Sequence, residues 1–85
     1  MKVIMYGSRI CADCRWAEKK LLERQDIELE YRQMTESVKL LKEFLVYRDN
    51  EEVFKPAREG EYIGIPFFIL EDGTKTLNIK DVINL

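Results

Sequence analysis

The sequence predicts a single α/β domain over residues 1–85, built on a mixed four-stranded sheet with helices on both faces. Two short apolar runs, at 3–6 and 67–70, are typical of buried strands, and the intervening segments repeat apolar residues at helical spacing. Asp72-Gly73 is a hairpin signal. The predicted order is β-α-β-α-β-β-α, a parallel strand pair with a right-handed crossover followed by an antiparallel hairpin.

The first half of the chain alternates strand and helix. Residues 3–6 are uniformly apolar, as expected of a strand buried on both faces. From Ala12 to about Gln25 apolar residues follow a helical stripe that begins at Cys14, so a helix should start at or next to the cysteines. Residues 27–32 alternate apolar and charged side chains, which predicts a strand with one wetter face.

A second helix should begin at Thr35, a residue type that caps helix N-termini. Its buried stripe is predicted to comprise Val38, Leu41 and Leu45, with a neighbouring stripe of Leu40, Phe44 and Tyr47. Residues 49–64 are charged, contain Pro56 and show no clean period, so we expect a helix end followed by a loop.

The C-terminal part is predicted to close the sheet. Residues 67–70 form a buried strand, and residues 74–77 return antiparallel to it after the Asp72-Gly73 turn. Residues 79–85 are expected to form a short helix whose inward side chains are Val82, Ile83 and Leu85.

Composition excludes several classes of function. The net charge of -2, without a basic stripe, argues against nucleic-acid binding. No segment resembles a signal peptide or approaches the roughly 20 apolar residues of a membrane helix, so we expect a cytoplasmic monomer without membrane contact. The chain has no histidine and two cysteines, which excludes a histidine base and supplies only half the ligands of a structural zinc site. No metal site is predicted.

The pair Cys11 and Cys14 forms a C-x-x-C motif at the predicted helix start. At this spacing the two sulfurs can meet in a disulfide without backbone movement. Free N–H groups and the positive end of the helix dipole would favour a thiolate at Cys11, which would attack a disulfide, and Cys14 would then resolve the mixed disulfide. Asp13, between the cysteines, would oppose the thiolate or complement the helix N-terminus.

Two other interpretations of the cysteines stay open. They could pack as small buried hydrophobes, or form half of a zinc site shared across a dimer. A C-x-x-C that follows a buried strand and opens a helix favours redox chemistry.

With these features the chain resembles the glutaredoxins over nearly its whole length: the first strand, Cys11-Ala-Asp-Cys14, the element order, Ile65-Pro66 before a strand, and the turn at Gly73. The resemblance implies a thioredoxin-like fold and reduction of protein or low-molecular-weight disulfides, with no bound cofactor and often with glutathione as reductant. It implies that Cys11 is the nucleophile, Cys14 the resolving thiol, and Pro66 a cis-proline facing them. Ile65 would then pair, strand-like, with an extended substrate.

The glutathione-binding features of the family are altered here. Ala12 and Asp13 stand where a proline and an aromatic residue are usual, and Ser8 stands where Lys or Arg is common. Arg9, one position later, is a candidate replacement for that charge, although it and Arg15 also suit solvated surface positions.

Leu77-Asn78 replaces the family's Gly-Gly pair, while Asp81 would match the acidic residue that follows it. The resemblance therefore implies weak use of glutathione, and the electron donor is either glutathione or an enzyme of the thioredoxin-reductase type. The alternative function is a non-catalytic redox sensor or interaction module.

Overall fold

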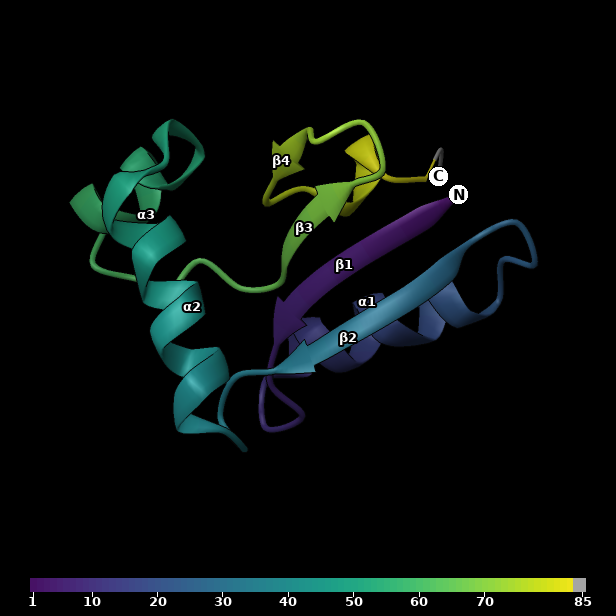
Figure 1. Ribbon diagram of the computed structural model, residues 1–85, viewed down its shortest axis with the longest axis horizontal. Helices are drawn as coiled ribbons and strands as arrows, with labels where there is room; N and C mark the ends of the chain where they lie inside the picture. The colour runs from purple at the N-terminus through teal and green to yellow at the C-terminus, as the bar shows by residue number, and fades with distance from the viewer. Residues whose placement is uncertain (84–85) are drawn as a thin grey trace.

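Four strands form one mixed sheet in the order β2-β1-β3-β4 (Figure 1). The central strand β1 (Lys2–Gly7) pairs in parallel with β2 (Glu28–Gln33) and antiparallel with β3 (Phe67–Leu70). The short strand β4 (Lys75–Thr76) pairs antiparallel with β3. This computed structural model describes residues 1–83, and it confirms the mixed four-stranded sheet.

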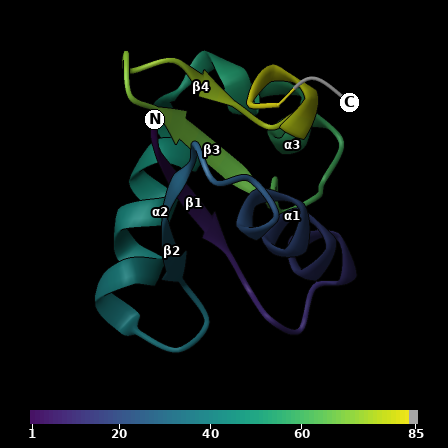
Figure 2. The same ribbon diagram turned by 90° about the vertical axis from the view of Figure 1, so that its right-hand side faces the viewer.

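Helices cover both faces of the sheet (Figure 2). On one face lies α1 (Ala12–Leu22), and on the other lie α2 (Val38–Asn50) and α3 (Lys55–Glu59). Side chains alternate along β1 because the strand is pleated, so Val3 and Met5 pack toward α1 while Tyr6 packs toward α2. The hydrophobic core is therefore two layers separated by the sheet.

The N-terminus of α1 lies where the sequence predicts it, but the helix ends earlier. Cys11 is the N-cap residue, with extended backbone angles, and Cys14 lies in the first turn. The helix stops at Leu22 rather than near Gln25, and the guanidinium of Arg24 pairs with the Asp26 carboxylate in the turn that follows.

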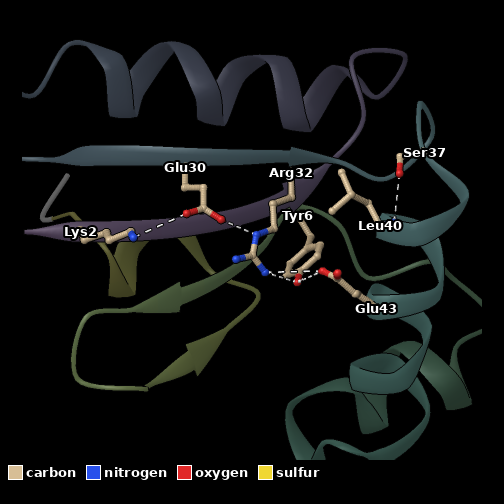
Figure 3. Close-up of polar contacts among 7 residues, drawn as sticks. All are labelled: Lys2, Tyr6, Glu30, Arg32, Ser37, Leu40 and Glu43. Carbon is tan, nitrogen blue, oxygen red and sulfur yellow. Dashed lines mark hydrogen bonds and ion pairs between the residues drawn. The ribbon is translucent and has the colours of Figure 1, made fainter.

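The predicted N-cap of α2 is wrong. Ser37 caps this helix, its hydroxyl accepting a hydrogen bond from the Leu40 N–H at 3.2 Å (Figure 3). The Thr35 hydroxyl is instead 2.6 Å from the hydroxyl of Ser8, in the loop that leads to the cysteines. Thr35 thus belongs to the turn after β2 and fixes that turn to the Ser8 loop.

The buried face of α2 is the neighbouring stripe, not the one centred on Leu41. Val38, Leu41 and Leu45 are 70%, 37% and 41% exposed. Phe44 is buried, because its ring packs edge-on against Phe54 at a centroid distance of 5.6 Å. Aromatic side chains bury more apolar area than leucines, so the aromatic stripe takes the core position.

Residues 49–64 are not a plain loop. A 3-10 turn, η1 (Glu52–Phe54), leads into α3, and Pro56 lies in the first turn of that helix. An N–H at this position has no partner within the helix, so proline removes no hydrogen bond there. Phe54 and Ala57 are buried, and these two side chains are too few to produce a visible helical period. Gly64 ends the segment at φ +89, and a Cβ there would lie 2.7 Å from the Phe54 ring.

The C-terminal hairpin is confirmed, with a shorter return strand than predicted. The Asp72 carboxylate accepts the Thr74 N–H at 2.9 Å, and Gly73 takes φ +90. Over residues 79–83, a 3-10 turn, η2 (Ile79–Asp81), which Asn78 caps, takes the place of the predicted closing helix. Val82 and Ile83 are buried as predicted, and Leu85 lies outside the described residues.

One polar cluster ties β1, β2 and α2 together (Figure 3). The Arg32 guanidinium donates to the Tyr6 hydroxyl and to the Glu30 carboxylate, and the Tyr6 hydroxyl donates to Glu43 at 3.1 Å. Lys2 lies 3.6 Å from Glu30 at the exposed end. We call these five residues the Arg32 cluster.

Across the described part of the chain, the helices are too short and too polar to pass through a membrane.

Candidate active site

The two cysteines differ in exposure although they lie within one helical turn. Cys11 is partly exposed at the N-cap of α1, and its side chain makes no capping hydrogen bond. Its main chain is fixed on both sides, since its N–H donates to the Ser8 carbonyl and its carbonyl accepts from the Arg15 N–H, both at 3.1 Å. Cys14 is 0% exposed, and both residues are free thiols. The Cys11 sulfur is therefore the reachable one.

The Cys14 thiol lies inside the hydrophobic core between α1 and β1. Burial raises its pKa to about 12, although a backbone hydrogen bond from Ser8 acts in the opposite direction. A hydrogen bond with the Cys11 thiol and the negative charge of Asp13 raise the pKa further. At neutral pH Cys14 therefore holds its proton.

Gly7 is a site residue that the sequence interpretation treated only as the end of a strand. A Cβ at this position would lie 2.9 Å from the Cys14 sulfur, 3.2 Å from Cε of Met5 and 3.2 Å from the Tyr31 hydroxyl. The absence of a side chain lets Cys14 pack directly on the end of β1. The sequence signal that could have indicated this role is a glycine that ends a buried strand just before the C-x-x-C loop.

The segment before β3 faces the cysteine loop. The Ile65–Pro66 peptide bond is cis, as expected. Ile65 and Asp13 line two neighbouring cavities, so the Pro66 segment and the start of α1 meet between them. Within residues 1–83, the main-chain N–H and C=O of Ile65 make no backbone hydrogen bond.

The cavity beside Cys11 is mostly apolar. It has a volume of about 530 Å³, and Ile10, Tyr62 and Ile63 contribute to its walls. Ser8 stands where Lys or Arg is common in the glutaredoxins, and it also lines this cavity. It is 1% exposed and hydrogen-bonded to Thr35, so this position supplies no positive charge to the cavity. The second cavity, about 300 Å³, lies beside Pro66 and includes Trp16, Leu77 and Asn78.

Arg9 and Asp81 line neither cavity. The Arg9 guanidinium lies over the Tyr31 ring at 6.0 Å and 3.9 Å from Glu18, and the Arg15 guanidinium donates to the Arg9 carbonyl at 2.8 Å. The Asp81 carboxylate accepts a hydrogen bond from the Thr76 hydroxyl. The structure thus brings together Cys11, Cys14, Asp13, Ile65 and Pro66, and leaves Arg9 and Asp81 outside this group.

Within residues 1–83, no three side chains of Cys, Asp or Glu converge as metal ligands would. Comparisons of the chain with protein-family models, with curated proteins and with solved structures find no match. A functional conclusion therefore depends on the chemistry of the cysteine loop.

Proposed function

We propose that this protein is a thiol–disulfide oxidoreductase with a glutaredoxin-like variant of the thioredoxin fold. The observation that carries the proposal is the difference between its two thiols: Cys11 is reachable at a helix N-cap, and Cys14 is fully buried one turn later. Dithiol exchange needs one accessible attacking thiol and one sheltered thiol that reacts only with its neighbour. The β2-β1-β3-β4 order and the position of the Ile65-Pro66 segment beside the start of α1 support the family resemblance.

In the first step the Cys11 thiolate attacks one sulfur of a substrate disulfide. A bond forms between Cys11 and that sulfur, the substrate S–S bond breaks, and the other substrate sulfur leaves as a thiolate that takes a proton from water. The first turn of α1 has no side-chain cap at Cys11, and free N–H groups at a helix N-terminus stabilise the negative charge that develops on sulfur during the exchange.

In the second step Cys14 resolves the mixed disulfide. Its sulfur bonds to Cys11, its proton passes to the departing substrate thiolate, and the substrate leaves as a free thiol. The dithiol has then lost two electrons and two protons, and the substrate disulfide has gained them. A thiol reductant or a thioredoxin-reductase-type enzyme returns the protein to its dithiol form.

The site favours protein disulfides over glutathione. The unpaired main chain of Ile65 suits an extended peptide that adds strand-like hydrogen bonds beside Cys11. The neighbouring cavity, with Ile10, Tyr62 and Ile63, suits an apolar side chain next to the substrate cysteine. Arg9, the candidate partner for a glutathione carboxylate, lies over Tyr31 instead.

The test is turnover of a protein disulfide with two single variants. Cys11→Ser should abolish reduction, whereas Cys14→Ser should still attack and accumulate the mixed disulfide. Thioredoxin reductase should support a higher rate than glutathione with glutathione reductase. A single stoichiometric oxidation without turnover would favour the redox-sensor alternative, and a chelator-sensitive dimer would favour a shared metal site.

A further inference from the structure

The hydroxyl of Tyr31 lies buried beneath the cysteine loop and, within residues 1–83, has no hydrogen-bond partner. Tyr31 is in the middle of β2, opposite Met5 of β1, and packs against the core on the α1 face. Its oxygen would be 3.2 Å from a Cβ on Gly7, and the Cys14 sulfur 2.9 Å from the same point. The phenol oxygen and the sulfur thus converge on one position at the end of β1.

An unpaired buried phenol has a cost, because a buried hydroxyl usually finds a partner. A phenylalanine at position 31 would fill nearly the same space without that cost. The hydroxyl is therefore expected to have its partner in a state other than the resting dithiol. In the proposed reaction Cys11 and Cys14 both change charge, and the sulfur that approaches the same point at Gly7 as the Tyr31 hydroxyl is that of Cys14.

The proton affinities of the two groups fit this view. Burial raises the pKa of Tyr31 to about 12, and the neighbouring Cys14, Glu18 and Cys11 raise it while Arg9 lowers it. Cys14 also has a pKa raised to about 12, mainly by burial. Tyr31 therefore keeps its proton at neutral pH and is available as a hydrogen-bond donor.

We propose that the Tyr31 hydroxyl donates a hydrogen bond to the Cys14 sulfur as it becomes a thiolate and resolves the mixed disulfide. This inference rests on the proposed dithiol function. Cys14 attacks Cys11, its proton goes to the leaving substrate thiolate, and Tyr31 stays protonated throughout. A backbone hydrogen bond from Ser8 already lowers the pKa of Cys14, so Tyr31 supplies a second donor to a buried charge that would otherwise be poorly solvated.

Three charged side chains also act on Tyr31 and Cys14. Glu18 and Asp13 lie on α1 and disfavour negative charge on Tyr31 and on Cys14, respectively. Arg9 from the preceding loop favours negative charge on Tyr31. These charges all remain in a Tyr31→Phe variant, so that variant isolates the hydroxyl.

A chromogenic aromatic disulfide separates the two steps in a stopped-flow experiment. Attack by Cys11 releases one coloured thiolate, and resolution by Cys14 releases the second. We expect Tyr31→Phe to leave the first phase within about twofold of wild type and to slow the second phase tenfold or more. The pH midpoint of the second phase should also move upward. Tyr47→Phe, which removes a hydroxyl from α2 on the opposite face of the sheet, should change neither phase.

A purely structural role for Tyr31 would lower the urea midpoint without moving the pH midpoint of the second phase, and that result overturns the inference. Should Tyr31→Phe fold poorly, 2,3-difluorotyrosine at position 31 retains the shape and makes the hydroxyl a stronger donor. The second-phase midpoint should then move downward, and an unchanged midpoint again overturns the inference. Absence of both phases in the wild-type protein would instead refute the proposed function.

Discussion

Gly7 leaves the Cys14 sulfur so close to β1 that a Cβ on the glycine would lie 2.9 Å from it. Real Cβ atoms essentially never make such a contact, so a side chain at position 7 must displace Cys14. The glycine is therefore part of the site, since it sets how deeply the second thiol is buried.

Gly7→Ala should reduce the free energy of unfolding by about 1–3 kcal/mol, the usual cost of overpacking a buried site. Urea unfolding under reducing conditions measures this cost. Cys14→Ala removes the clashing sulfur, so the same glycine substitution should cost less in that background. An equal cost in both backgrounds would place the clash at Met5 or Tyr31 instead.

Stability should depend on pH above the neutral range. The pKa of Cys14 rises from 9.0 to about 12 on folding, and the pKa values of Tyr6 and Tyr31 rise from 10.0 to about 12. Between about pH 9 and pH 12 the unfolded chain releases these protons while the folded chain retains them. The contribution of these groups to the free energy of unfolding therefore has its full value below pH 9 and falls as the pH rises toward 12.

Urea titrations from pH 7 to 11, with a reductant present, measure this decline. Cys14→Ala should flatten its first part, and Tyr31→Phe should flatten the part above pH 10. A free energy of unfolding that stays constant up to pH 11 in the wild-type protein would contradict the pKa changes.

The Arg32 cluster should contribute to stability through its central residue rather than its exposed end. Arg32 has charged or hydroxyl partners on β1, β2 and α2, whereas Lys2 has one partner at 3.6 Å. We expect Arg32→Met to reduce the free energy of unfolding by about 1–2 kcal/mol, since hydrogen bonds to charged groups contribute this much when partly buried. Lys2→Ala should cost less than about 0.5 kcal/mol, as exposed ion pairs usually do. Equal costs would show that the Arg32 bonds are as weak as surface pairs.

Strong local patterns predicted the strands and the position of the cysteines. The apolar runs at 3–6 and 67–70 each became a buried strand, and the C-x-x-C marked the start of α1. The buried face of α2 was harder, because two adjacent stripes have the same helical period. Packing against Phe54 and Phe67, distant in sequence, selects the stripe that contains Phe44.

The sequence did not indicate which residues pack against Cys14, because these contacts also join residues that are distant in sequence. Gly7 and Tyr31 reach the sulfur only because β1 and β2 pair in a register that sets Met5 opposite Tyr31. No spacing along the chain encodes that register. A buried hydroxyl without a partner becomes visible only in three dimensions.

The negative charge of Asp13 should slow the chemistry of the cysteine loop. It lies in the first turn of α1 and raises the pKa of Cys14. Next to a half-exposed sulfur, one charge changes the energy of a developing negative charge by less than about 1 kcal/mol, a factor of two to four in reaction rate. We expect Asp13→Asn to raise the rate of Cys11 alkylation by iodoacetamide at pH 7 by this factor, and to speed the second phase of the stopped-flow assay.

The same substitution should cost about 0.3–1 kcal/mol of stability, because an acidic residue in the first turn complements the helix dipole. Glu23→Gln, at the other end of α1, is the matched control and should leave alkylation unchanged. High salt should shrink the effect of Asp13→Asn, since mobile ions screen a partly exposed charge. A slower second phase in the Asn variant would reverse the conclusion, because it would mean that the Asp13 carboxylate accepts the Cys14 proton during resolution.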